Sequence, residues 1–281
     1  MPDQTLDLSE QAILQNSPRM DLNTRFSFRC GPAMDCFNRC CSDVAILLSP
    51  YDVLRLKNAL RMDSSEFLGK YTLTMRSQDR HIPAVFLRMN EEMRKCPFVA
   101  ESGCQVYPHR PWACRMYPLG MAEPKGPNAA AQRLYFLVKE EICHGHGAGK
   151  DKDQSVREWI EQQRLDPYDE MQVPFLALMS HPGWDNPENN LTEQKLAMYY
   201  MALYDLDRFR RFVSETRFLE LFDVDEARIE AITEDDEELL EFAFDWLAFS
   251  LFQERRMKLR KPVGGAPAVA ATTRRICCPT V

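Results

Sequence analysis

The apolar residues in the first part of the chain occur in short runs that predict strands and helical stripes. Residues 44–48 (VAILL) form a partly β-branched run that predicts a buried strand. Ser49 is expected to cap a helix that has Pro50 at its first position and continues through YDVLRLKNAL. Asp63, with Glu66 three residues later, predicts the start of a second short helix over SSEFLGKYT.

Three further runs predict strands: residues 82–89 (IPAVFLRM), 104–107 (CQVY) and 133–139 (RLYFLVK). Six prolines lie between residues 97 and 127, and proline interrupts regular structure. We therefore expect the cysteines from 96 to 114 to lie on loops around a small sheet, where ligands can converge without obeying strand or helix spacing.

Longer helical patterns fill the second half of the chain. Ser155 and Glu158 form a capping box ahead of VREWIEQQRL, and residues 191–222 are strongly helical. Residues 235–260 predict a long helix that begins acidic and ends basic, in agreement with the helix dipole. Within it, residues 242–252 (FAFDWLAFSLF) are apolar almost all round, which predicts burial in the core or against a partner protein, with the core favoured.

These elements predict an α+β fold: a small irregular antiparallel sheet with cysteine-rich metal-binding loops, followed by a mainly α-helical C-terminal half. We divide the chain into a mobile N-terminal arm (1–24), a cysteine-cluster metal-binding domain (25–185), a helical region packed on it (186–260) and a disordered tail (261–281). The tail is rich in glycine, alanine and proline.

Composition narrows the class of protein. The chain has 281 residues, of which 45% are hydrophobic, and a formal net charge of −7, so nucleic acid is not expected as the main partner. No apolar run is long enough for a membrane span, and the N-terminus lacks the basic and apolar regions of a signal peptide. We expect a cytoplasmic protein, in which ten cysteines serve metal binding rather than disulfides.

The cysteines crowd into one part of the chain. Two of the ten, Cys277 and Cys278, lie in the predicted tail and are not expected to be ligands. The other eight are the candidate metal ligands: Cys30, Cys36, Cys40, Cys41, Cys96, Cys104, Cys114 and Cys143. Zinc sites and [4Fe–4S] clusters each take four such ligands, so eight thiolates could serve two centres, or one centre with spare thiols.

The spacing of the cysteines along the sequence does not identify the metal. The pattern C-x5-C-x3-C-C followed by C-x7-C-x9-C has no C-x2-C pair, which excludes a zinc finger, ribbon or RING, and it does not match ferredoxins. Adjacent Cys40 and Cys41 could serve two neighbouring centres, reach one ion in a tight turn, or divide into one ligand and one packed thiol.

Other polar residues near the cysteines have two interpretations each. Arg110 and Arg115 could offset the charge of a thiolate cluster, or pair with surface acids. His144 and His146 could bind metal, but a structural role is favoured because they lie in a flexible-looking glycine-rich link. His109, in a loop after a proline, is a weaker candidate still.

The segments CFNRCCSDVAILLSPYDVLRLK, EFLGKYT and CPF…GCQVYPHRPWACRMYPLG carry a family resemblance. They resemble the YkgJ-type cysteine-cluster family, a zinc- or iron-chelating domain with a CxxCxxCC-like motif, over roughly residues 25–170. In the shorter members two residues separate the first two cysteines of the motif, whereas in this chain five residues separate Cys30 from Cys36.

The resemblance implies metal binding of undefined cellular role, with an iron–sulfur cluster or zinc as the cofactor. One branch of the family resembles the flagellin lysine N-methylase, which implies an iron–sulfur-dependent modifying enzyme as the alternative. The chain has no G-x-G-x-x-G loop for S-adenosylmethionine, and GHGAG (145–149) is better explained as a hinge. A zinc or iron chaperone or sensor is the other alternative.

Overall fold

The computed structural model describes residues 18–76, 82–122, 133–148, 153–186 and 192–260. The fold is α+β as predicted, with small antiparallel sheets in the first half of the chain and most helices in the second. Residues 1–17 of the predicted arm and the predicted tail (261–281), with its two cysteines, lie outside the described residues. Within the described ranges, no helix is both long and apolar enough to cross a membrane.

Three strands form the central antiparallel sheet, in the order β2 (Leu47–Leu48), β4 (Pro83–Leu87) and β3 (Thr72–Arg76). The strand predicted at 82–89 is confirmed by β4, whereas the run predicted at 44–48 is a strand only over its last two residues. The sequence did not predict β3, because its residues do not alternate between buried and exposed: only Thr72 is buried, and the four residues after it are exposed. Leu73 and Met75 point to solvent with 48% and 60% of their surface exposed.

Three two-stranded antiparallel sheets surround the cysteines. They pair β1 (Arg25–Ser27) with β9 (Asp153–Ser155), β5 (Val99–Ala100) with β6 (Gly103–Cys104), and β7 (Leu119–Ala122) with β8 (Leu134–Leu137). The strand predicted at 133–139 is confirmed by β8. The strand predicted at 104–107 is wrong beyond Cys104, because the chain enters a 3-10 helix, η2 (Tyr107–His109), around Pro108.

Local capping signals correctly predict two helices. The Ser49 hydroxyl accepts the backbone N–H of Asp52, and the Asp52 carboxylate accepts the backbone N–H of Ser49 at 2.8 Å. This capping box starts α2 (Pro50–Leu60), and the same arrangement starts α5 (Val156–Gln163). A third helix, α3 (Ser64–Tyr71), begins at the predicted residue, where the Asp63 side chain accepts a backbone N–H.

A short helix in the cysteine region was not predicted. Pro111 precedes α4 (Trp112–Met116), which therefore carries Cys114 on a helix. The expectation that the cysteines from 96 to 114 lie on loops is thus wrong for Cys114, and also for Cys104, which ends β6. Helices and strands of six residues or fewer in a proline-rich stretch are too short to show a recognisable periodic pattern in the sequence.

The second half of the chain is helical. It contains α6 (Asp166–Met179), α7 (Glu193–Tyr204), α8 (Leu206–Glu215), α9 (Phe218–Leu221), α10 (Glu226–Glu234) and α11 (Asp236–Phe252). Buried Asp205 separates α7 from α8, and its carboxylate accepts the Ser64 hydroxyl at 2.6 Å. The helix predicted to run to residue 260 ends at Phe252, because Gln253 adopts a left-handed conformation with φ 58°.

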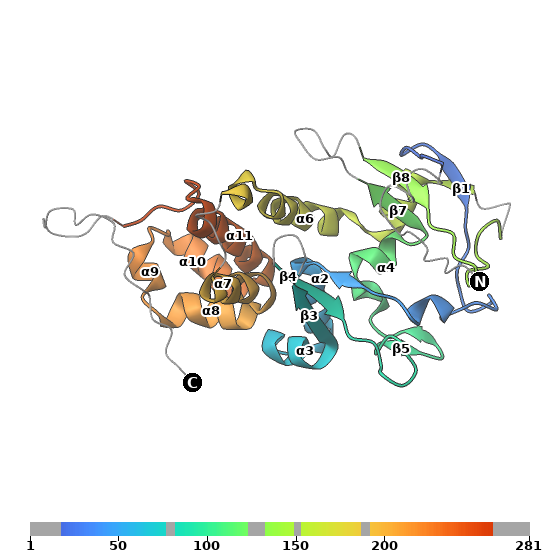
Figure 1. Cartoon of the computed structure of the whole chain (residues 1–281), viewed down its shortest axis with the longest axis horizontal. Coiled ribbons are helices and arrows are strands. Elements are labelled where there is room, and N and C mark those ends of the chain that lie inside the picture. The colour runs from blue at the N-terminus through green and yellow to red at the C-terminus, as the bar shows by residue number, and fades with distance from the viewer. Residues whose placement is uncertain (1–17, 77–81, 123–132, 149–152, 187–191, 261–281) are drawn as a thin grey trace, which may run out of the picture.

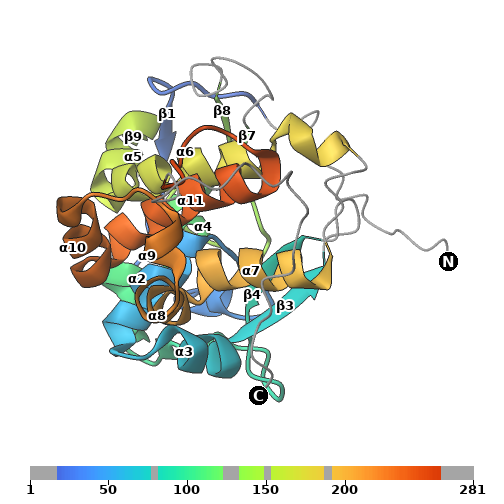
Figure 2. The ribbon, with the colours of Figure 1, turned by 90° about the vertical axis from the view of Figure 1, so that its left-hand side faces the viewer.

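A large core lies around α11, which contacts α2, α6, α7, α8 and α10 (Figure 2). Phe242, Phe244 and Trp246 are all at least 96% buried in it, so the core interpretation of residues 242–252 is confirmed. The same core includes side chains of α2, α3 and the central sheet. The helical half is therefore packed directly on part of the cysteine-bearing half.

A smaller core lies at the other end of the molecule, beneath β1, β7 and β8 (Figure 1). Its buried members are Met20, Phe26, Phe28, Met116, Leu119, Tyr135, Val156 and Leu165. Cys96 and Cys104 pack against the larger core, Cys143 packs against the smaller one, and Trp112 contacts both. Cysteines from two distant segments thus border the two cores, and Trp112 joins these cores.

Candidate metal centre

The eight candidate cysteines come from three stretches of the chain (30–41, 96–114 and 143), and all of them are free thiols. Cys30 and Cys36 follow β1, and Cys40 and Cys41 end a one-turn 3-10 helix, η1 (Arg39–Cys41). Cys96 precedes β5, Cys104 ends β6, and Cys114 lies on α4. Cys143 lies in the loop after β8.

Four of the thiols form the first set, which we call group 1: Cys30, Cys36, Cys40 and Cys143. Burial raises the pKa of Cys30, and the charges of the other three raise it further. The thiols of this set are thus near enough for the charge of one to act on another. The buried hydroxyl of Tyr117 also faces this set, since burial and then contact with Cys143 raise its pKa.

Backbone contacts explain how group 1 forms. The N–H of Arg29 donates to the carbonyl of Gly145 at 3.0 Å, which holds the chain at Cys30 beside the chain at Cys143. A Cβ on Gly145 would lie only 2.5 Å from the Arg29 carbonyl oxygen, so a side chain cannot be placed there without moving the backbone. The predicted hinge glycine therefore serves close packing of two cysteine segments.

The other four thiols form group 2: Cys41, Cys96, Cys104 and Cys114. The charges of Cys96 and Cys114 act on Cys41, and those of Cys96 and Cys104 act on Cys114. The N–H of Cys96 donates to the carbonyl of Cys41 at 2.8 Å, which fixes these two segments side by side. Cys114 is exposed to solvent, yet protein atoms surround it closely enough that burial raises its pKa to about 12.

The adjacent cysteines Cys40 and Cys41 belong to different groups. Their sulfurs are hydrogen-bonded to each other, which lowers the pKa of Cys40 to about 7 and raises that of Cys41. Asn38, with φ 68°, enters the 3-10 turn and donates from Nδ2 to the carbonyl of Ala100 at 3.0 Å. The turn that carries Cys40 and Cys41 is therefore anchored to the β5–β6 hairpin.

The Cys40–Cys41 pair should be the first site of alkylation in the metal-free, reduced protein. The pKa of the Cys40 thiol is lowered to about 7, whereas the thiol of an ordinary cysteine has a pKa of about 8.5. The reactive thiolate of Cys40 therefore forms at lower pH than that of an ordinary cysteine. Modification by iodoacetamide should therefore rise steeply from about pH 6 to about pH 8 at this pair. Cys114, with a pKa of about 12, should stay unmodified over that range. Peptide mass spectrometry measures both rates, and equal rates at the two sites would contradict the assignment.

The two arginines have different surroundings. Buried Arg110 donates to the Tyr107 carbonyl at 2.7 Å. Burial raises the pKa of Cys104 and of Cys114, and the positive charge of Arg110 offsets part of that increase. Arg115 donates to backbone carbonyls, including that of Arg110 at 3.0 Å, and stacks on Tyr168. Arg110 therefore acts on group 2, whereas Arg115 holds the loop that carries it.

The spacing of the sulfurs limits the occupant. Across the described ranges, no three cysteine sulfurs lie within 4.8 Å of one another. A tetrahedral zinc ion with Zn–S bonds of about 2.3 Å holds its sulfurs roughly 3.8 Å apart. A [4Fe–4S] cluster spreads its four thiolates more widely, because each binds a different iron.

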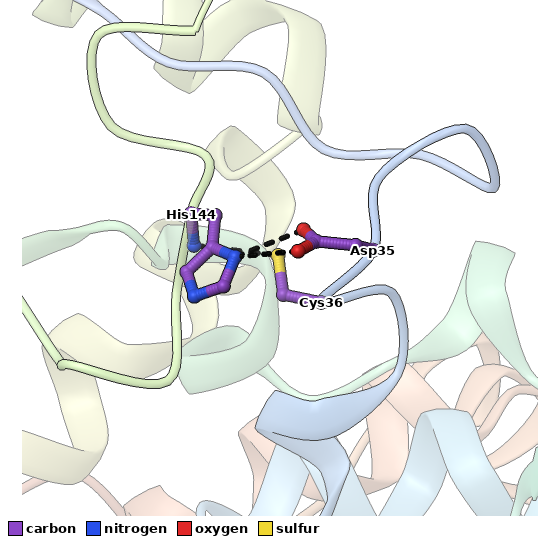
Figure 3. A group of neighbouring side chains, drawn as sticks. All are labelled: Asp35, Cys36 and His144. Carbon is purple, nitrogen blue, oxygen red and sulfur yellow. Dashed lines mark hydrogen bonds and ion pairs between the residues drawn. The ribbon is translucent and has the colours of Figure 1, made fainter.

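A mixed set of donors meets at Cys36 of group 1, where Asp35 and His144 point toward each other (Figure 3). The Nδ1 atom of His144 lies 2.9 Å from each carboxylate oxygen of Asp35, and the backbone N–H of His144 donates to the Cys36 sulfur at 3.3 Å. The sequence did not single out Asp35, since no local pattern joins residues 109 positions apart. The available signal was that Asp35 and His144 each adjoin a cysteine.

The remaining histidines have other surroundings. His146 packs against Phe28 with ring centroids 5.3 Å apart, and both of its ring nitrogens are buried without a hydrogen bond to described residues. His109 lies 3.2 Å from Arg55. Neither ring belongs to a group of potential metal donors among the described residues.

Comparison with known proteins gives one finding on identity. No curated protein and no solved structure matches this chain. Residues 29–144, which contain all eight candidate cysteines, match a family model described as "Putative zinc- or iron-chelating domain". The chain therefore matches the CxxCxxCC family model over this segment, as its cysteine motifs predicted.

Proposed function

We propose that the protein binds metal through two adjacent four-cysteine centres, group 1 and group 2, and that each holds an iron–sulfur cluster. The division of eight thiols into two sets of four carries this proposal. The family match supports zinc or iron chelation by this segment, and the wide sulfur spacing favours the cluster over zinc.

The chain's own residues fit such occupants. Each group offers four thiols, the number of thiolates that a [4Fe–4S] cluster takes. When bound, such a cluster supplies redox chemistry, and charge, hydrogen bonds and exposure set its potential. Arg110 places a positive charge beside group 2, and the Tyr117 hydroxyl lies beside Cys143 of group 1. These residues would act on the two centres differently.

Anaerobic isolation tests the proposal. We expect a brown protein with about eight iron and eight sulfide per chain, since each cluster contains four of each. Iron and acid-labile sulfide assays, visible absorption and EPR after reduction measure this. A colourless protein that contains two zinc ions would mean that zinc, and not an iron–sulfur cluster, occupies the two centres. A folded, metal-free protein from anaerobic isolation would refute metal binding altogether.

A further inference from the structure

Three donor atoms of different chemical kinds meet at Cys36 of group 1. The Asp35 carboxylate, the Cys36 sulfur and a ring nitrogen of His144 all lie within 4.8 Å of one another. They come from two loops that lie side by side in Figure 3. A histidine–aspartate pair on a surface is common and by itself weakly stabilising. Here the pair lies over a buried thiol, to which the same histidine donates its backbone N–H.

The donor set selects a class of cation. One imidazole nitrogen, one thiolate and one carboxylate suit borderline divalent ions such as Zn²⁺, Fe²⁺ and Co²⁺, whereas Mg²⁺ and Ca²⁺ prefer oxygen ligands throughout. The side chains of His144 and Asp35 are 47% and 67% exposed, so solvent can complete the coordination. Three protein ligands with an open position are typical of sites that exchange ligands, and structural zinc sites are closed by four.

We infer that Asp35, Cys36 and His144 form a third, solvent-open site for one borderline divalent cation, which loads group 1 through the shared Cys36. This inference rests on the proposed function, because it assigns Cys36 to both sites. Binding requires the Cys36 thiol to lose its proton to water and the imidazole to keep its single hydrogen on Nε2, so that Nδ1 is free to bind. A single ion then passes inward, with no change of oxidation state, when a second thiolate of group 1 replaces one of the exposed ligands; assembly of a complete cluster from such ions would take sulfide and an oxidant from solution in addition.

The position of Cys36 makes the transfer direct. Cys36 is 9% exposed, its sulfur accepts the backbone N–H of His144 at 3.3 Å, and its charge acts on Cys30 of group 1. An ion held by Asp35 and His144 therefore already has one ligand of the inner set. Arg39 is the basic group whose charge also acts on Asp35, and a bound cation must overcome its repulsion.

Cobalt binding by the stripped protein tests the inference. The full chain, reduced and freed of metal by a chelator under argon, is titrated with Co²⁺, and thiolate charge-transfer absorption reports binding. We expect Asp35→Asn and His144→Asn to bind one equivalent fewer than wild type, and to load group 1 about 10- to 100-fold more slowly. Glu141→Gln, an exposed acid in the loop of His144, is the matched control and should behave as wild type.

The outcomes separate the two proposals. Unchanged Co²⁺ stoichiometry and rate in both variants would overturn the third site, while normal iron and sulfide in the same proteins would leave the two centres standing. Absence of metal at the cysteines in wild type would refute both. A measurement on the unaltered chain guards against misfolded variants: Zn²⁺ should shift the ¹⁵N resonances of one of the five histidines, and no shift would contradict the inference.

Discussion

Replacing Cys40 by serine should remove the metal of group 1 and leave that of group 2, and Cys41→Ser should do the reverse. The two residues are adjacent, but their sulfurs belong to sets formed with different distant cysteines. A serine hydroxyl is a poor ligand for soft cations, so each change deletes one of four ligands at one centre only. Each variant should therefore retain about half of the wild-type iron.

Metal and sulfide analysis of the anaerobically isolated variants measures this. The double variant Cys40→Ser/Cys41→Ser should lose nearly all metal, and Cys278→Ser, in the predicted tail, should lose none. The EPR spectra of the two single variants should differ, because Arg110 neighbours group 2 and Tyr117 neighbours group 1. Complete metal loss in either single variant would instead indicate one shared centre, the alternative that the sequence leaves open.

Local signals were the part of the fold that sequence could predict. Ser49 was predicted as a helix cap and Ser155 with Glu158 as a capping box, and both start helices, because such caps depend on residues a few positions apart. At α3 the Asp63 cap forms without the reciprocal Glu66 contact. The aromatic run at 242–252 predicts burial because it is apolar on every side, and α11 is buried. The family resemblance rests on motifs of the same local kind, and the family model matches there.

What sequence could not predict depends on contacts between distant segments. Cysteine spacing gives eight thiols, but only the hydrogen bonds at Gly145 and at Cys96 determine which segments meet. The partnership of Asp35 with His144 is of the same kind. α4 escaped detection because a five-residue helix that follows Pro111 has too few turns for a periodic pattern. The candidate residues were thus predictable one by one, and their grouping was not.

Removing the metal should loosen the smaller core and leave the larger one folded. The smaller core lies beneath two-stranded sheets, which are marginally stable on their own. Cysteines border both cores, and metal bound by them contributes free energy of folding. For structural zinc that contribution is on the order of 10 kcal/mol, far more than a single side-chain contact supplies.

Hydrogen–deuterium exchange with mass spectrometry measures the effect before and after chelation under reducing conditions. Peptides of β1, β7, β8 and α5 should lose protection, while those of α7 and α11 should exchange as before, because neither helix carries a candidate ligand. In the double variant Cys40→Ser/Cys41→Ser the chelator should change nothing further. Equal loss of protection at α11 would mean that the two cores unfold as one unit. Unchanged exchange at β1 and β8 would mean that the smaller core is stable without metal.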